Sequence, residues 1–529
     1  MLTAPIEPKT EIEQEIFGLW KELDPNSAFT YGLPEFAGKI FIPSKENVAS
    51  ILKKIRTLKS KAENEVQQKL LESYESDMVY DEPQYAPSNA VWAIYSHKVR
   101  GAGKEQWAEL LSNILLSLKI SRKGLESKNW PLEIRILTSM RCNSLIYMAD
   151  LIKNRGNSSL VKQIQKEAAL YRLKLGEKRL QHLNSFGEVW NLLQEGKGFN
   201  RRGIYDYCLK VSYNYTETPE AIEKRAEMWL EDELPKLRSV VSELSQAYGC
   251  EASETAVEAE IQKRRAPKDI KSFLVSMRTQ TLPIIKKNLC GITPDYDVRI
   301  VETPNYLRNF IPTAAIEMYD LFKKPYIMFY VTPDDSHMPG LLQTLIHEEY
   351  GHAINFLNSA SDFVAKPSFV ELLPSDLDGP LTEGISFHRE MEFLQMMKSG
   401  KVKLNGIKDW PLFVKEFEFV TLKWRVIRFL RAIGDVRLNL NKQTPAEFIT
   451  WAHEKTGLAE KDVYNQVFLH EGSPGYIPSY AVVGMRIAEL QKKAKKKGKS
   501  IRDFNTYAAS IGFPARTIWE KKLIRWINN

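Results

Sequence analysis

The stretch LLQTLIHEEYGHAINFLN, residues 341–358, places two histidines five positions apart, with a glutamate directly after the first. These residues are His347, Glu348 and His352. In the common His-Glu-x-x-His metal motif, the histidines are four positions apart and share one helix face. Positions five apart on a regular α-helix point about 140° away from each other. A one-residue bulge would restore the shared face. We therefore predict a bulge between Glu348 and His352, where Gly351 gives the backbone the necessary freedom.

The segment PLTEGISFHREMEF, residues 380–393, offers a third metal ligand. A catalytic zinc ion takes about three protein ligands and keeps a fourth position open for water. We expect Glu383 to complete the set for one zinc ion, since a carboxylate in the first turn of a helix also suits the helix dipole. Glu390 lies two turns on and could hold a histidine's second nitrogen. Glu348 is then the general base that takes a proton from zinc-bound water. The alternative is two unrelated histidines on a buried helix.

The composition is that of a folded, globular protein: 529 residues, of which 43% are hydrophobic and 26% charged. No apolar run approaches the roughly 20 residues that cross a bilayer. The start, MLTAPIEPKTEIEQEIF, lacks the basic and apolar regions of a signal peptide. The four cysteines lie far apart, without a C-x-x-C pair. These features favour a reducing cytoplasm over a disulfide framework.

The net charge of +8 is spread along the chain, and its densest cluster is QKKAKKKGKS near the C-terminus. Such a run is typical of a solvated helix end. We therefore expect neither nucleic acid nor a membrane as a partner. The sequence leaves open whether the chain is a monomer or a homodimer.

Apolar residues recur at three- and four-residue spacing through most of the chain, which predicts a mainly α fold. Two segments favour strands: DYDVRIVET (295–303) and KPYIMFYVTP (324–333). The second ends just before the histidine helix, so we expect a small β-sheet there. The charged stretch at 249–269 divides the chain into a helical lobe, 1–250, and a lobe with the metal site, 251–529. Both lobes belong to one continuous fold in this interpretation.

Several motifs resemble those of known metallopeptidases. HEEYGH has the six-residue spacing of the dipeptidyl peptidase III motif. The wider layout resembles a bacterial and archaeal domain-of-unknown-function family with a His-Glu-x-x-Pro-Gly-His motif followed by Glu-Gly-Trp-Ala-x-Tyr-x-Glu. EGISFHRE matches the second motif, with Glu383 and Glu390 at the right separation. RFLRAIGD and SPGYIPSY, which ends at Tyr480, resemble two further segments, and the likeness runs along nearly the whole chain.

The chain also departs from this pattern. The proline before Gly-His is absent, Asn439 stands where a histidine often occurs, and Arg437 replaces a glycine. His470 lies near a position where arginine is expected. These differences leave the expected metal ligands intact but put the substrate preference in doubt.

The resemblance implies a zincin-like hydrolase of mainly helical build with a central cleft, similar to carboxypeptidase Taq and the oligopeptidases. It implies a zinc-dependent metallopeptidase that hydrolyses short peptides, as a carboxypeptidase or as an oligopeptidase that releases dipeptides. The alternatives are a zinc hydrolase of a non-peptide amide or small metabolite, and an inactive helical scaffold of the same fold.

Within this mechanism, a tyrosine or histidine should stabilise the oxyanion; Tyr480 is the first choice and His470 the second. Tyr480 could instead be a packing residue. Arg428 and Arg431 could bind a substrate carboxylate, or form a structural ion-pair network with the nearby Asp435. We also expect the strand at 327–331 to be an edge along which an extended peptide lies, with Tyr330 in the substrate-binding wall.

Overall fold

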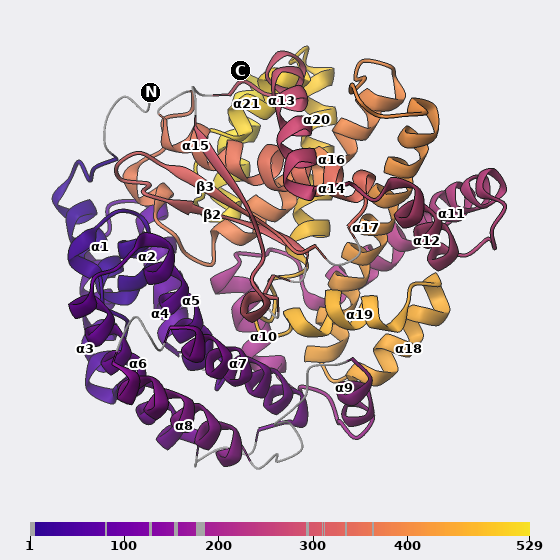
Figure 1. Ribbon diagram of the computed structural model, residues 1–529. Helices are drawn as coiled ribbons and strands as arrows, with labels where there is room; N and C mark the ends of the chain where they lie inside the picture. The colour runs from indigo at the N-terminus through magenta and orange to yellow at the C-terminus, as the bar shows by residue number, and fades with distance from the viewer. Residues whose placement is uncertain are drawn as a thin grey trace.

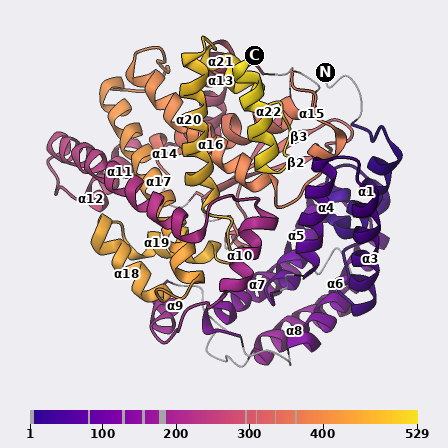
Figure 2. The ribbon, with the colours of Figure 1, turned by 180° about the vertical axis from the view of Figure 1, so that it is seen from behind.

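The computed structural model describes residues 6–79, 82–125, 130–152, 157–175, 186–292, 296–308, 310–311, 313–333, 336–361 and 364–529. The fold is mainly α, with one small three-stranded sheet, as the sequence predicts. Figure 1 shows the N-terminal helices at the left and lower left, and the sheet between them and the helices that carry the histidines. Figure 2 brings the C-terminal helices to the front.

Helices of the first half are α1 (Glu11–Leu23), α2 (Pro25–Thr30), α3 (Lys45–Lys61), α4 (Glu65–Val79), α5 (Tyr85–Arg100), α6 (Lys104–Gly124), α7 (Leu132–Leu151), α8 (Ser158–Lys174), α9 (Phe186–Leu193), α10 (Arg202–Tyr207) and α11 (Pro219–Tyr248). Those of the second half are α12 (Glu254–Arg265), α13 (Ile270–Asn288), α14 (Met338–Leu345), the π-helix η6 (Ile346–Ala353), α15 (Ile354–Ala360), α16 (Asp378–Lys398), α17 (Trp410–Asn439), α18 (Pro445–Thr456), α19 (Glu460–Gln466), α20 (Ser479–Lys496), α21 (Ile501–Ala508) and α22 (Arg516–Asn528).

The ends of the long helices follow local sequence signals. Thr218 caps α11 by accepting a hydrogen bond from the Ala221 amide, and Pro219 occupies the first helical position. Gly249 ends the same helix in the left-handed conformation. The chain therefore turns at 249, where the charge pattern suggests a boundary. The division into lobes at residue 250 stays a prediction.

The sheet has the strand order β1-β3-β2. Strand β1 (Asp297–Glu302) runs parallel to β3 (Tyr326–Val331), and β2 (Ala314–Tyr319) runs antiparallel to it. Both predicted strands are present, although residue 295 lies outside the described residues. Strand β2 was not predicted, because its six residues, AAIEMY, show too weak a pattern to stand out.

The prediction that residues 327–331 form an edge strand is wrong. All six residues of β3 are buried, and the strand is paired on both sides. This uninterrupted apolar run is typical of a strand covered on both faces. The free edge beside the histidine helix belongs to β2 instead.

The Tyr330 side chain faces the N-terminal helices and not an open cavity. Its side chain is fully buried, and its ring packs against Tyr95 of α5 at 5.7 Å between centroids. Its hydroxyl donates to Glu317 Oε2 at 3.2 Å. Alternate residues of a strand face opposite sides, and the side that Tyr330 faces is covered by the N-terminal helices.

Helices α16 and α20 approach each other closely at two glycines. A Cβ atom on Gly384 would lie 2.6 Å from Val483 Cβ and 3.0 Å from the Gly484 amide nitrogen. The small residue after Glu383 therefore lets the two helices come together. The contact fixes the helix that carries Glu383 against the helix that carries Tyr480.

We expect Gly384→Ala to destabilise the protein by about 1–3 kcal/mol, because the new methyl group overpacks a rigid contact that includes backbone. Gly18→Ala in α1 is the matched control, since no atom lies within 4 Å of its Cβ position; it should be neutral or stabilise by up to about 1 kcal/mol. Chemical denaturation measures both. Equal stability changes in the two variants would contradict the packing account.

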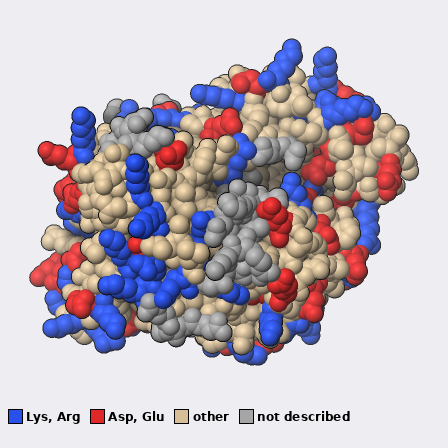
Figure 3. Space-filling model, turned by 60° about the horizontal axis from the view of Figure 1, so that its bottom comes forward, with Lys and Arg blue, Asp and Glu red and all other residues tan. Residues whose placement is uncertain are grey.

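The surface carries both signs of charge. On the face in Figure 3, Lys and Arg gather at the lower left, and acidic and basic side chains are mixed over the rest. Among the described helices, none combines the length and the apolar character needed to cross a bilayer. The expectations about nucleic acid, membranes and oligomeric state stay predictions.

Candidate metal centre

The histidine helix is a π-helix over Ile346–Ala353, which confirms the predicted bulge. The wider turn brings His347 and His352 to the same side, with their Nε2 atoms 3.2 Å apart. The reason given for Gly351 needs correction. Its φ angle is not positive; a Cβ there would overlap the Oγ and Cβ atoms of Ser386 in α16. Glycine is therefore required at 351 for the close approach of α16.

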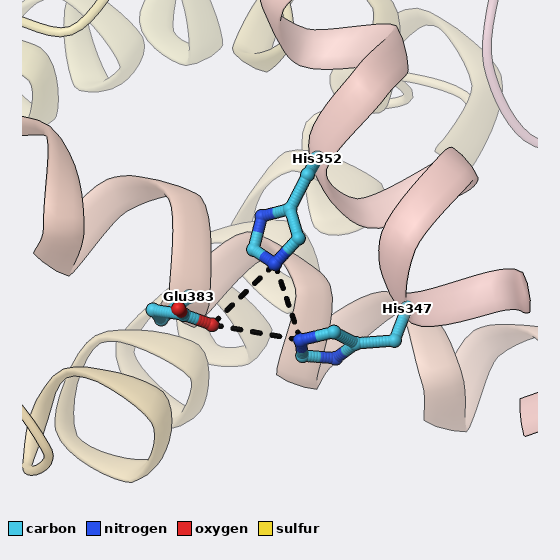
Figure 4. Close-up of side chains that lie close together, drawn as sticks. All are labelled: His347, His352 and Glu383. Atoms are coloured by element: carbon cyan, nitrogen blue, oxygen red, sulfur yellow. Dashed lines mark hydrogen bonds and ion pairs between the residues drawn. The ribbon is translucent and has the colours of Figure 1, made fainter. Parts of the chain in front are cut away.

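Glu383 joins the two histidines from α16 (Figure 4). Its Oε2 lies 3.5 Å from the Nε2 atom of His347 and 3.5 Å from that of His352. Ligands about 2.0–2.1 Å from a tetrahedral zinc ion are separated by roughly 3.3–3.4 Å. The three atoms therefore have the spacing that a single tetrahedral ion requires. Together, these residues form a group that could hold a metal ion.

The second nitrogen of each histidine has its own partner. Nδ1 of His347 lies 2.5 Å from Glu390 Oε1, which is the contact expected of Glu390. Nδ1 of His352 lies 3.1 Å from Ser386 Oγ, and this hydroxyl donates to the Thr382 carbonyl oxygen. Because Ser386 uses its proton there, it accepts from His352. Both Nδ1 atoms then carry protons, and the lone pairs that bind metal lie on the facing Nε2 atoms.

Two tyrosines stand beside this group. The Tyr476 hydroxyl donates to Oε1 of Glu383, which leaves Oε2 toward the histidines. The Tyr480 ring stacks on His347, with centroids 6.2 Å apart and planes 16° from parallel. Tyr480, the residue chosen from sequence, thus flanks the histidine, while Tyr476, four positions earlier in the same SPGYIPSY segment, holds the carboxylate.

Two buried carboxylate oxygens support the fit of a metal to this site. Oε2 of Glu383 and Oε2 of Glu348 are buried and receive no hydrogen bond from the described residues. An unpaired buried carboxylate oxygen is costly, so each needs a cation, a proton donor or water. Two imidazole nitrogens and one carboxylate oxygen are also the donor types of catalytic zinc sites. The residues present therefore fit a divalent metal.

The protonation of the metal-free site follows from its burial and its charges. Burial by itself would lower the pKa of His347, but the carboxylates of Glu383 and Glu390 outweigh this effect and raise the pKa to about 9. Burial lowers the pKa of His352 to about 4. Without metal, the proton on His347 Nε2 therefore lies between the two rings. Burial raises the pKa of Glu348 to about 7.

The three groups open into a cavity of about 320 Å³. Its walls include the free edge of β2 at residues 314–316, and also Tyr480, His470, Arg428 and Arg431. Burial, followed by the nearby positive charge of Arg431, holds the pKa of His470 well below its usual range, so His470 is neutral at pH 7.

The two arginines have different partners. Arg428 Nη1 donates to Glu390 Oε2 at 2.7 Å, so this guanidinium supports the carboxylate that contacts His347. Arg431 donates to the main-chain and side-chain oxygens of Gln466 at 2.8 and 2.6 Å. Its Nη1 atom makes no hydrogen bond within the described part of the chain. The buried Nε atom of Arg428 also makes no hydrogen bond to a described residue, so each arginine keeps a donor for a ligand.

Sequence reasoning missed Ser386, Tyr476 and the edge of β2. Ser386 lies three positions after Glu383, so the helix period places it on the same face, and that signal was available. Tyr476 lay inside a segment already singled out. The β2 edge had no comparable signal.

The fold is shared with known structures of unknown function. No protein-family model matches the sequence, and no curated protein matches it. A candidate lipoprotein of unknown function from Shewanella oneidensis has a TM-score of 0.66 and 16% identity, covering 98% of this chain and 99% of that one. A candidate lipoprotein from Colwellia psychrerythraea has a TM-score of 0.61 and 14% identity, covering 98% and 100%. At these identities the likeness shows the fold alone.

A third structure, a candidate oligoendopeptidase F from Bacillus anthracis str. Ames, has a TM-score of 0.36 and 11% identity, covering 93% of this chain and 97% of that one. A likeness at this level carries no functional argument. The function must therefore be argued from the site itself.

Proposed function

We propose that this protein is a zinc-dependent peptidase that hydrolyses short peptides. The observation that carries the proposal is the set of His347, His352 and Glu383 at tetrahedral spacing, with the unpaired carboxylate of Glu348 beside it. When bound, zinc would supply Lewis acidity to the scissile carbonyl and lower the pKa of water. An inactive scaffold would have no chemical need for Glu348 at this place.

The residues of the chain have distinct roles in this proposal. Glu348 takes a proton from the attacking water as the new C–O bond forms and the carbonyl oxygen becomes an oxyanion. It then passes this proton to the nitrogen of the leaving amine as the oxyanion collapses and the C–N bond breaks. A pKa near 7 suits a group that must both accept and return a proton. Tyr480 donates to the developing oxyanion, and neutral His470 is the second candidate for that role.

An extended substrate would lie along β2. The outward backbone groups at residues 314–316 make no hydrogen bond to other described residues, and they line the metal cavity. An edge strand with free backbone groups can bind a peptide as an added strand. Arg431 would bind a substrate carboxylate through its remaining donor.

The free cysteines fit action in a reducing cytoplasm. Cys142, Cys208 and Cys290 are buried, Cys250 is half-buried, and none forms a disulfide. This location is part of the proposal.

The experiment that tests the proposal is a cleavage profile of the zinc-loaded protein over a peptide library, with and without a chelator. We expect chelator-sensitive hydrolysis of peptides. Zinc-dependent hydrolysis of small amides with no peptide cleaved would point to a non-peptide amidase. A zinc-loaded chain without any hydrolysis would identify a scaffold.

Zinc binding should release about one proton at pH 7, because His347, with its pKa of about 9, must lose a proton to bind the ion. His352 is already neutral and contributes none. Zinc affinity should therefore fall by about tenfold per unit as the pH drops from 8 to 6. Calorimetric titrations in two buffers of different ionisation enthalpy measure the release. Buffer-independent heats would show that His347 is neutral in the metal-free protein.

Tyr476→Phe should weaken zinc binding by about 10- to 100-fold, because Glu383 loses the hydroxyl that orients it. Tyr480→Phe is the matched comparison: it should keep zinc affinity and lower kcat by about 10²–10³-fold if this hydroxyl stabilises the oxyanion. Competition with a chromophoric chelator gives the affinities, and peptide hydrolysis gives kcat. The reverse pattern would exchange the roles of the two tyrosines.

A further inference from the structure

A second cavity, of about 380 Å³, adjoins the metal cavity. Four residues line both: Thr313, Thr344, Trp424 and Gln466. Each cavity lies at the lower end of the roughly 300–1,000 Å³ range of ligand pockets. Because they share these side chains, the two hollows adjoin along one boundary. We call these four residues the neck.

Strand β2 leads from one cavity to the other. Residues 314–316 line the metal cavity, and Thr313, directly before them, lines both. On the far side, Val331 and Thr332 of the neighbouring chain segment line the second cavity. Val331 is the register partner of Ala314, and the Thr332 amide donates to the Thr313 carbonyl oxygen at 2.8 Å. The second cavity therefore lies at the end of the sheet where β2 begins and β3 ends, which is the end toward which a peptide added to β2 and continued past Ala314 would run.

The hydrogen bond across the neck is a weak one. The Gln466 Nε2 atom donates to Thr313 Oγ1 at 3.5 Å, the long limit of a hydrogen bond. Arg431 fixes the other end of the Gln466 amide, Oε1, at 2.6 Å. Arg431, which would bind a substrate carboxylate in the proposed function, thus also holds one side of the neck in place.

The second cavity has both apolar and charged walls. Its walls include the apolar side chains of Met140, Val189, Leu341 and Leu469. Its one buried ammonium group, that of Lys423, is paired with Glu258 at 2.6 Å and Asp462 at 3.3 Å. The side chains of Arg308 and Lys461 line this cavity as well. The apolar part of the wall is the part that suits an uncharged, apolar side chain.

We infer that the second cavity is a subsite for an apolar side chain of peptides longer than about four residues. The inference rests on the proposed peptidase function. The outward backbone groups of Ala314 and Ile316 can pair with an extended peptide, and the part of it opposite residues 313–316 is about four residues, or roughly 13 Å, long. Any further residue at that end reaches beyond the neck. The substrate class is thus an oligopeptide with an apolar residue beyond the metal-site segment.

The test is peptide binding to the zinc-loaded Glu348→Gln protein, measured by calorimetry for peptides of three to eight residues. Added residues are leucine in one series and aspartate in the other. We expect at least about a tenfold tightening between four and seven residues in the leucine series, and none in the aspartate series. Equal affinities for all lengths, or equal gains in both series, would overturn the inference.

Asn465→Trp provides a second test, because Asn465 lines the second cavity but not the first. The indole should fill the subsite, remove the gain with length and leave tetrapeptide affinity unchanged. Asn465→Ala is the matched control and should keep the gain. Loss of tetrapeptide and heptapeptide binding alike in Asn465→Trp would overturn the assignment.

Cleavage by the unaltered, zinc-loaded protein separates the subsite from the peptidase function on which it rests. Cleavage of peptides without an effect of length would refute the subsite alone. The absence of any cleavage would refute the peptidase function.

Discussion

Glu348→Gln should lower kcat for peptide hydrolysis by about 10²–10⁴-fold while leaving zinc affinity unchanged. Glutamine keeps the shape of the side chain but cannot take a proton from water. Glu348 supplies none of the three atoms that could bind the metal, so the ion should bind as before. Steady-state kinetics and zinc content, measured on the same preparation, check the two halves of this expectation.

Glu349→Gln is the matched control, one position along the same π-helix. Glu349 points elsewhere, because its carboxylate contacts Arg278 at 2.7 Å and Tyr296 at 2.6 Å. This variant should keep kcat within a few-fold. Thermal unfolding reports the stability that is lost with the ion pair. If Glu348→Gln retained more than about a tenth of the activity, the general base would have to be another group.

His352→Ala should abolish stoichiometric zinc binding and, with it, activity. The variant removes one of three ligand atoms, which should cost more than the roughly 10- to 100-fold expected for the loss of an outer partner. His453→Ala is the control. His453 lies in α18, away from the site, and its ring contacts the carbonyl oxygen of Leu458. The zinc content per chain after gel filtration distinguishes the two variants.

Retention of about one zinc per chain by His352→Ala would contradict the assigned ligand set. A circular dichroism spectrum excludes unfolding as the cause of metal loss. As a second test of the ligand set, Glu383→Gln keeps the volume of the side chain but replaces an anionic donor with a neutral one, so its zinc affinity should also fall.

The histidine spacing predicted more of the site than any other feature. A five-residue interval is incompatible with a shared face on a regular helix, so metal binding required a wider turn, and the π-helix over Ile346–Ala353 provides it. The helix that carries Glu383 could also be found, since EGIS combines a carboxylate with small residues. Periodicity likewise predicted the mainly α class.

Other parts of the site depended on tertiary contacts that periodicity does not encode. The apolar run at 326–331 indicates a buried strand, yet nothing in it shows which neighbours pair on each side. Tyr330 was therefore assigned to the wrong wall. Gly351 was explained by backbone freedom, but its role depends on Ser386, 35 residues later, on another helix. The second cavity lies between side chains as distant in sequence as Met140 and Leu469.

The most direct measurement of the central claim is a titration of zinc into chelator-treated protein while peptide hydrolysis is followed. The account predicts no hydrolysis at the start, a rise in proportion to added zinc, and a plateau at about one ion per chain. Hydrolysis that survives the chelator, or a chain that holds one zinc ion and still cleaves no peptide, would contradict it.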